Sequence, residues 1–230
     1  MKKSIEKARG NFFPLLNVPG FPAGTPVRKA LIVGERPESL TVYLSAFAAS
    51  LGFKVLIADG ANSFDPYVIS KFARKEGFQP DELLKEISVA RAFTCHQLAT
   101  LIRKRLDPVV PPGVSSLIVF LGPCTMFFDE DVPGEEAALL FRKMLAKVQE
   151  MSQRGVFFLM SQSFSGFNKR RGFLLRDLVN FSDAVLKLKS SSDALQVVLD
   201  KPLLALRRPW EVFEEFKKIA ISGQLSAISD

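Results

Sequence analysis

Short apolar runs alternate with segments of helical periodicity along most of the chain, and this alternation constrains the fold more than any other feature. Continuous apolar runs are typical of strands buried in a parallel sheet, and they occur at 29–34, 54–59, 87–93, 115–122, 156–163 and 183–190. Between them, helical patterns occur at 37–52, 63–77, 80–87, 94–106 and 135–155. This order predicts an α/β domain with a mostly parallel sheet and helices on both faces.

The same patterns predict one core domain with a segment on either side. Residues 1–17 are predicted to be a basic tail, and residues 18–190 form the core. Residues 191–230 are predicted to be a small appendage, in which a strand at 195–200 precedes an amphipathic helix at 209–220. We expect that helix to pack against the domain.

Composition indicates a globular protein of the cytoplasm without a membrane partner. Hydrophobic residues make up 47% and charged residues 24% of the 230 residues. The apolar runs are much shorter than a membrane span, and no apolar segment follows the basic start as in a secretory signal. The two cysteines, Cys95 and Cys124, do not make a disulfide framework. The net charge of +7 favours nucleic acid or another anionic partner.

The stretch LIVGERPESLTVYL, residues 31–44, places a glycine between an apolar strand and a helical pattern. A phosphate loop, G-x-x-x-x-G-K-[ST], has the same position between a strand and a helix. On that template Gly34 takes the first glycine and Thr41 the final hydroxyl, whereas Ser39 replaces the second glycine and Leu40 the lysine. On this motif alone, an ordinary turn between a strand and a helix explains the stretch better.

Glu35 and Glu38 also fall inside this stretch. Carboxylates repel a triphosphate, and the start of a helix itself favours them. We therefore expect a site occupied by the protein's own acids rather than by ATP and magnesium. Arg36 is the one residue of the stretch that offers a positive charge to a phosphate, and it leaves an atypical nucleotide site as an alternative.

Four further segments resemble the RecA/RadA recombinase superfamily in order and approximate spacing. ARAFTCHQL (90–98) is similar to that family's A-R-A-x-x-x-x-H-Q segment, and GFPAGTPVRKALIVG (20–34) is similar to its lead-in to the phosphate loop. ADGANSFDP (58–66) resembles the family's D-x-E-G-x-F segment, and FFLMSQS (157–163) resembles its strand ending in asparagine and glutamine. The resemblance covers about residues 18–190 and implies a RecA-like fold.

The family's catalytic positions are substituted in this chain. Leu40 stands at the position of the phosphate-loop lysine, Leu121 or Gly122 at that of the magnesium-binding aspartate, and Ala61 at that of the catalytic glutamate. Asp59 and Gln162 remain at family positions. ATP hydrolysis depends on the missing groups, so the resemblance implies a degenerate ATPase fold without a nucleotide cofactor.

Basic and aromatic residues alternate after the MSQ strand, where the family has a DNA-contacting loop. We expect nucleic-acid contacts there because cations neutralise phosphates and aromatic rings stack on unpaired bases; these residues are Phe167, Lys169, Arg170, Arg171, Phe173 and Arg176. A solvated basic turn is the alternative. The run at 103–105 ends a predicted helix, and the helix dipole explains its charges without a ligand.

Two other clusters are expected to be structural. Cys95 and His96 are neighbours at the start of a helix, where their side chains are expected to point in different directions, so they are predicted to pack or cap rather than to catalyse. The acids at 129–131 are predicted to form a solvated loop just before the helix that starts near Pro133.

The sequence therefore predicts a non-catalytic, recombinase-like accessory factor in DNA repair or recombination. Its expected partners are DNA, single-stranded DNA included, a RecA-like partner subunit, or further copies of this chain. Two alternatives stay open: an ATPase with an atypical phosphate loop, and a scaffold subunit that binds no nucleic acid.

Overall fold

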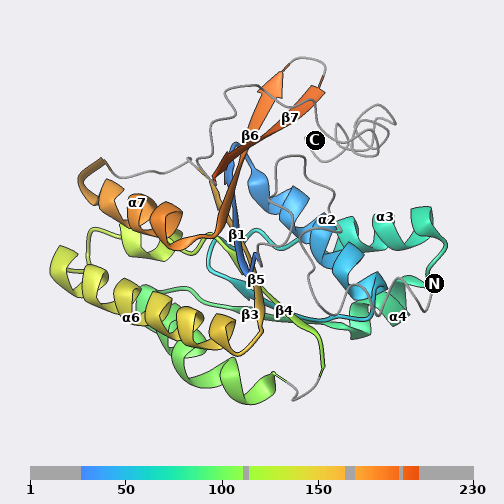
Figure 1. The fold of residues 1–230 in the computed structure, drawn as a ribbon, viewed down its shortest axis with the longest axis horizontal. Coiled ribbons are helices and arrows are strands. Elements are labelled where there is room, and N and C mark those ends of the chain that lie inside the picture. The colour runs from blue at the N-terminus through green and yellow to red at the C-terminus, as the bar shows by residue number, and fades with distance from the viewer. Residues whose placement is uncertain (1–26, 111–113, 164–168, 192–193, 202–230) are drawn as a thin grey trace.

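A mostly parallel sheet forms the centre of the protein (Figure 1). The structure, a computed structural model, describes residues 27–110, 114–163, 169–191 and 194–201. The sheet has seven strands in the order β3-β2-β4-β5-β1-β6-β7. All neighbouring strands are parallel except β6 and β7, which are antiparallel. This arrangement confirms the predicted α/β class and is consistent with a RecA-like fold.

The strands lie close to the predicted apolar runs. Their bounds are β1 Lys29–Gly34, β2 Lys54–Asp59, β3 Ile87–Arg91, β4 Ser116–Leu121, β5 Phe157–Ser163, β6 Ala184–Ser191 and β7 Ala194–Lys201. The α-helices are α2 Pro37–Ser50, α3 Pro66–Glu76, α4 Pro80–Lys85, α5 Cys95–Thr100, α6 Gly134–Gln153 and α7 Gly172–Phe181. Shorter turns are the π-helix η2 Leu101–Arg105 and the 3-10 helices η3 Asp107–Val109, η4 Thr125–Phe128 and η5 Lys169–Arg171.

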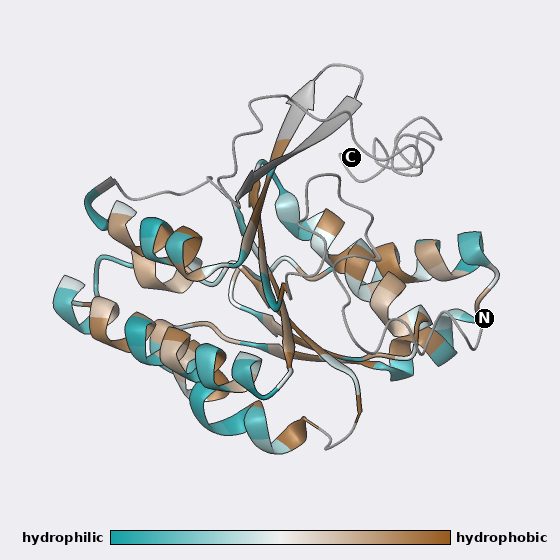
Figure 2. Ribbon diagram, in the orientation of Figure 1, coloured by the Kyte–Doolittle hydropathy of each residue, from teal (hydrophilic) through white to brown (hydrophobic). Residues whose placement is uncertain are grey.

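Helices cover both faces of the sheet, as Figure 1 shows. Helices α2, α3 and α4 pack on one face through a core that includes Phe53, Ile69 and Phe72. Helices α5, α6 and α7 pack on the other face around Phe120 and Phe141. Figure 2 shows the same division, with hydrophobic strands in the middle and hydrophilic residues on the outer sides of α6 and α7. Within the described residues, no helix combines the length and the apolar character that a membrane crossing requires.

Two elements differ from the sequence-based prediction. Helix α7 occupies a stretch that we expected to be a loop, and Leu174 and Leu178 are fully buried on one side of it. Strand β7 pairs with β6, so the strand that we expected in the appendage extends the core sheet. The basic tail and the helix predicted at 209–220 lie outside the described residues.

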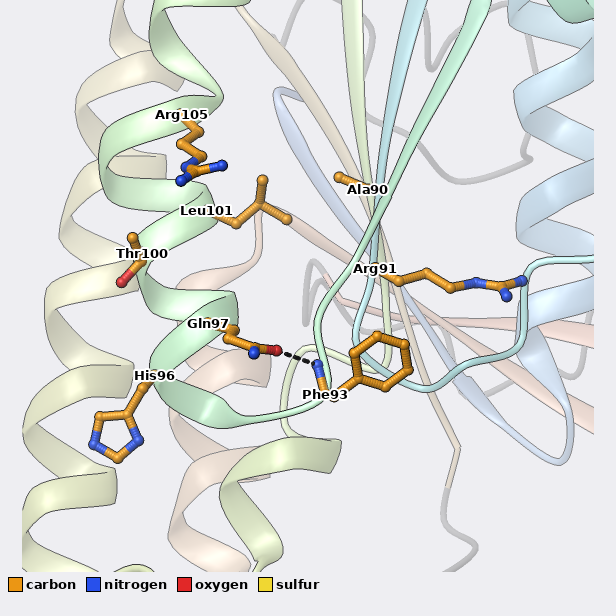
Figure 3. Close-up of a pocket in the computed structure, with 8 residues that line it drawn as sticks. All are labelled: Ala90, Arg91, Phe93, His96, Gln97, Thr100, Leu101 and Arg105. Atoms are coloured by element: carbon orange, nitrogen blue, oxygen red, sulfur yellow. Dashed lines mark hydrogen bonds between the residues drawn. The ribbon is translucent and has the colours of Figure 1, made fainter.

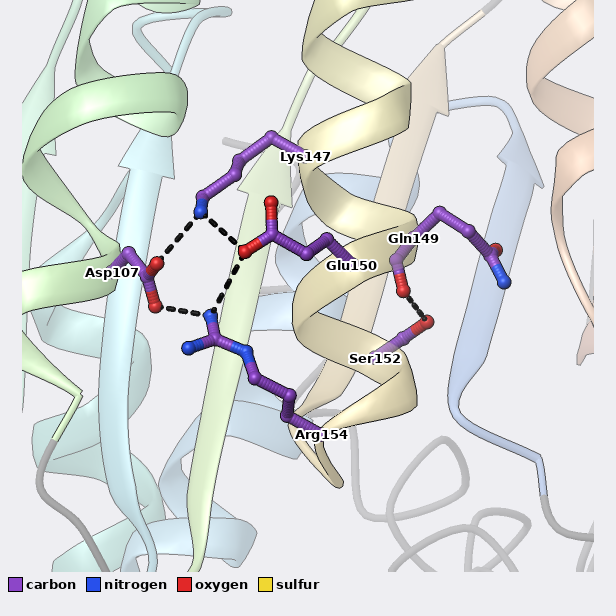
Figure 4. A network of polar contacts seen from close by, with 6 residues as sticks. All are labelled: Asp107, Lys147, Gln149, Glu150, Ser152 and Arg154. Carbon is purple, nitrogen blue, oxygen red and sulfur yellow. Dashed lines mark hydrogen bonds and ion pairs between the residues drawn. The ribbon is translucent and has the colours of Figure 1, made fainter.

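A network of ion pairs fastens the end of α6 to η3 (Figure 4). Asp107 accepts from Lys147 at 2.7 Å and from Arg154, while Glu150 accepts from Lys147 at 2.8 Å. Hydrogen bonds from Lys147 and Arg154 hold the pKa of Asp107 below its ordinary value, and the same bond to Asp107 raises the pKa of Lys147. The network lies at the end of α6 that leads into β5, away from the candidate site at the carboxyl ends of the strands.

Candidate functional site

The turn between β1 and α2 is much shorter than a phosphate loop. Helix α2 begins at Pro37, so only Glu35 and Arg36 separate it from the end of β1. In the phosphate-loop motif, the whole G-x-x-x-x-G-K-[ST] segment precedes the helix, and its backbone amides surround the phosphates. Here Pro37 has no amide N–H, and Ser39 and Thr41 already lie inside the helix. The turn therefore lacks the row of free amides that would surround a phosphate.

Gly34 is required by the pairing of β1 with β6. Its φ angle is +144°, and a Cβ atom at this position would lie 2.4 Å from the backbone oxygen of Leu188. Gly34 and Leu188 are direct partners in the parallel ladder of β1 and β6. The close approach of two strands thus explains this glycine without a ligand.

The carboxylate of Glu38 lies at the beginning of α2, where a bound phosphate would otherwise lie. The residue is 8% exposed. Burial is the largest cause that raises the pKa of Glu38, and the charge of Asp59 acts in the same direction. Hydrogen bonds from the backbone of Glu38 itself and of Ser163, and the charge of Arg36, oppose this increase. An acid of the chain thus takes the place at a helix start that favours anions.

The side chains at the lysine and hydroxyl positions of the template point into the protein. Leu40 is 5% exposed and belongs to the core on the α2 face of the sheet. Thr41 is fully buried, and its hydroxyl donates to the backbone oxygen of Pro37 at 2.9 Å. Neither side chain can reach a phosphate or a magnesium ion from this position.

Replacing Glu38 with glutamine is expected to stabilise the protein at neutral pH by on the order of 1 kcal/mol, the size typical of one buried polar group. In the folded protein, the pKa of Glu38 is raised above the ordinary value of 4.5. Its contribution to the free energy of unfolding is therefore most favourable below pH 4.5 and is lost as the pH rises through the folded pKa. Urea unfolding from pH 4 to pH 8 measures the difference. The difference in the free energy of unfolding between the glutamine variant and the wild type should be larger at pH 7 than at pH 4. An equal difference at both pH values would contradict the raised pKa of Glu38.

Asp59, at the end of β2, organises the following loop. Its carboxylate is fully buried and accepts from the backbone amides of Ala61, Ser63 and Phe64 at 3.2, 3.1 and 3.0 Å. The Nε group of Arg91, from the end of β3, donates to the same carboxylate at 3.3 Å. Since four donors surround it, Asp59 acts as the anchor of this loop.

Gln162 and Gly122 lie at the ends of β5 and β4. The resemblance predicts that the magnesium-binding aspartate of the family is replaced in this region. The amide oxygen of Gln162 accepts from the backbone N–H of Cys124 at 2.8 Å, and its nitrogen donates to the hydroxyl of Thr125 at 3.3 Å. Gly122 has a φ angle of +65°, and a Cβ atom there would lie 2.5 Å from the Cβ of Ala61. Gly122 and Ala61 are therefore packed closely against each other, and Leu121, the other position considered for the aspartate, is fully buried.

The basic segment after β5 contributes both surface and core side chains. Arg170 and Arg176 are exposed. Arg171 is only 9% exposed, and its guanidinium donates to the backbone oxygens of Phe127 at 2.8 Å and Val132 at 2.5 Å. The donors of Arg171 therefore hold the segment around η4, and its contact with nucleic acid stays a prediction.

The other predicted residues of this segment divide in the same way. Phe173 is partly buried and packs against the core on the α7 face, so its ring is only half available for stacking. Phe167 lies outside the described residues, and of Lys169 the structure describes only the backbone. The acids at 129–131 are exposed, as predicted.

An open groove of about 580 Å³ lies between the edge strand β3 and the helix formed by α5 and η2 (Figure 3). Ala90 and Leu101 contribute apolar surface to it, and Arg105 lies along it, while the guanidinium of Arg91 points away from α5 and η2. Phe93 lies at the lower end of the groove in this view and is 67% exposed. No function was predicted for this groove from the sequence, although most of its lining residues belong to the ARAFTCHQL segment or to the basic run at 103–105.

Cys95 and His96 are in contact, which contradicts the expectation that they point apart. The Sγ atom of Cys95 lies 3.5 Å from Nδ1 of His96, and Nε2 of His96 lies 2.8 Å from a carboxylate oxygen of Glu136 on α6. Cys95 is 1% exposed, and burial raises the pKa of its thiol. A buried thiol that stays protonated is a poor nucleophile, so the arrangement joins α5 to α6 rather than forming a reactive centre.

No known family model matches this chain. In the described ranges, no group of three or more His, Cys, Asp or Glu side chains is placed to hold a metal ion. The structure is that of an α/β protein in which α2 begins two residues after β1 with the buried Glu38 in its first turn. Exposed cations follow β5, and a groove that includes the exposed Phe93 follows β3.

Proposed function

We propose that this protein is a non-catalytic, RecA-like protein that binds single-stranded DNA as an accessory factor in DNA repair or recombination. The observation that carries the proposal is the early start of α2 at Pro37, with the buried carboxylate of Glu38 at its amino end. A site closed in this way offers no cradle to a triphosphate and leaves binding, rather than hydrolysis, as the function of the fold.

Support for nucleic acid comes from charge and position together. Exposed Arg170 and Arg176 follow β5, so they lie near the carboxyl ends of the parallel strands, where ligands of open α/β sheets bind. The net charge of +7 adds a long-range attraction for a polyanion.

An ATP hydrolysis assay tests the non-catalytic part. Purified protein with magnesium is expected to release phosphate at the background rate, because Leu40 replaces the lysine that neutralises the phosphates and Ala61 replaces the glutamate that activates water. Turnover above background that disappears in a Thr41→Ala variant would overturn this part. Micromolar binding of ATP and magnesium in isothermal titration, lost on Arg36→Gln, would favour the atypical nucleotide site instead.

Neutralising the cations after β5 is expected to weaken DNA binding. A combined Lys169→Gln, Arg170→Gln and Arg176→Gln variant should bind a fluorescent oligothymidylate more weakly and lower the slope of log K against log salt by up to about two, at about 0.7 per lost phosphate contact. Arg171 is kept because it holds η4. Fluorescence anisotropy at salt concentrations from about 25 to about 200 mM, which span low to physiological ionic strength, gives both the affinity and the salt slope.

A matched control is available on the opposite face of the sheet. Helix α3 carries the exposed cations Lys71, Arg74 and Lys75, and their replacement by glutamine removes the same formal charge. This control variant should retain most of the affinity and the salt slope. Equal losses in the two variants would indicate attraction by net charge alone, and no binding of wild-type protein at low salt would refute the DNA proposal.

A second candidate is a scaffold subunit that binds no nucleic acid. The observation that favours it is the edge position of β3 in the described sheet, where Val89 is 39% exposed. An edge strand offers unpaired backbone groups to another chain. Light scattering that shows a stable oligomer, combined with no binding of oligothymidylate, would select this candidate.

A further inference from the structure

We propose that the groove between β3 and α5 is a nucleotide subsite, in which Phe93 stacks on one base of a single-stranded nucleic acid and Arg105 contacts a neighbouring phosphate. The inference rests on the proposed function and deepens it. It places a second contact region on the molecule, separate from the cations after β5.

Phe93 is an exposed aromatic ring on a fixed backbone. Its backbone N–H donates to the side-chain oxygen of Gln97 at 2.9 Å, and the backbone N–H of Gln97 donates to the hydroxyl of Thr94 at 3.1 Å. These two bonds form a cap at the start of α5 and are visible in part in Figure 3. A large apolar ring that is 67% exposed gains most from an occupant that covers it, and an unpaired base supplies a matching flat face.

One guanidinium group, that of Arg105, lies along the groove, whereas the guanidinium of Arg91 turns away from α5 and η2 (Figure 3). Arg91 is oriented by Asp59, as described above, and by the backbone oxygen of Phe64, which accepts from one of its Nη groups at 3.2 Å. Arg105 is exposed at the end of η2, and no carboxylate of the described residues forms an ion pair with it. The helix dipole favours a cation at this end, but it does not account for an arginine and an exposed ring along one groove. An aromatic ring together with positive charge matches a nucleotide.

The dimensions of the groove also suit part of a nucleic-acid strand. Its volume of about 580 Å³ falls within the range of about 300–1,000 Å³ that small-ligand sites have. Along it, Figure 3 shows Thr100 and Leu101 between Phe93 at one end and Arg105 at the other. The groove is open rather than enclosed, so a polymer can enter sideways and extend beyond both ends.

The subsite and the cations after β5 lie along one edge of the sheet. Phe93 follows the carboxyl end of β3, and the basic segment follows the carboxyl end of β5. The strands β2 and β4 lie between them, so the ends of β3 and β5 are three strand spacings, or roughly 14 Å, apart. A single-stranded nucleic acid that runs along this edge of the sheet can contact both regions.

The test uses the full chain and a fluorescent oligothymidylate. Phe93→Ala is expected to weaken binding by about five- to 150-fold, the loss that corresponds to one base stacked on one aromatic ring, with little change in the salt slope. Arg105→Gln is expected to lower the salt slope by about 0.7. Phe93→Trp, which keeps a stacking surface, should restore most of the affinity.

Matched controls separate the groove from the rest of the surface. Tyr67→Ala on α3 removes a ring that is 74% exposed, and Arg74→Gln on the same helix removes an exposed cation. Both should bind as the wild type does. As an independent readout, an oligonucleotide with one 5-iodouracil should form a photochemical cross-link to Phe93, located by mass spectrometry of the peptide.

The outcomes distinguish this inference from the proposed function. Binding that depends on Lys169, Arg170 and Arg176 but is unchanged by Phe93→Ala refutes the subsite and leaves the DNA function standing; a polypeptide would then be the better candidate for the groove. No binding of oligothymidylate at low salt refutes both. A loss in Phe93→Ala equal to that in Tyr67→Ala also refutes the subsite.

Discussion

Replacing Asp59 with alanine is expected to lower the free energy of unfolding by about 3–5 kcal/mol, the cost of removing one partner from a buried charged cluster. The carboxylate is fully buried, and its loss leaves the backbone amides of Ala61, Ser63 and Phe64 without their acceptor. The side chain of Arg91 loses its anionic partner at the same time. Chemical denaturation measures the change in the free energy of unfolding. The circular dichroism spectrum of the folded variant shows whether the sheet persists.

The control for this prediction is another aspartate in the same loop. Asp65 caps α3 and accepts one hydrogen bond, from the backbone N–H of Tyr67 at 2.8 Å. Asp65→Ala should cost about 1 kcal/mol, as for other helix caps. A loss of similar size in Asp59→Ala would show that the cluster contributes no more than an ordinary cap.

Replacing Gly34 with alanine is expected to cost about 3–5 kcal/mol, because steric overpacking and an unfavourable φ angle act together. The added Cβ would lie 2.4 Å from the backbone oxygen of Leu188, a position that the β1–β6 ladder cannot relax without breaking register. The loss should be the same with and without ATP. A variant of normal stability that has lost nucleotide binding would instead support a phosphate-binding role for this glycine.

Gly77 provides a comparison without the steric cause. It ends α3 with a φ angle of +77°, and nothing lies within 4 Å of the position of an added Cβ. Gly77→Ala should therefore cost only about 1 kcal/mol, from the backbone conformation alone. The additional loss in Gly34→Ala reflects the clash with Leu188 together with the less favourable φ angle of +144°.

The start of α2 could be predicted from the sequence, and it conflicts with the phosphate-loop alignment. Proline is favoured in the first turn of a helix, so Pro37 indicated a helix from that residue. The template instead requires a loop as far as Thr41. The two interpretations cannot both hold, and the local signal of proline was the better guide to the structure.

Other features depend on contacts that a sequence pattern does not contain. A run of basic residues predicts a surface, yet Arg171 is buried because two backbone oxygens are within reach of its guanidinium. The groove includes Phe93 and Arg105, which belong to different motifs of the sequence and lie at its two ends. The pairing of Leu174 with Leu178 on one side of α7, by contrast, was a readable helical signal.

The carboxylate at the start of α2 has a consequence for how the protein responds to its surroundings. Ligand-binding folds gain stability in proportion to the logarithm of ligand concentration, so their folded populations follow the supply of that ligand. Glu38 is part of the chain, and its effective concentration at the helix start is therefore constant. We expect the thermal stability of this protein to be indifferent to the ATP level of the cell, so that its abundance is not tied to energy status.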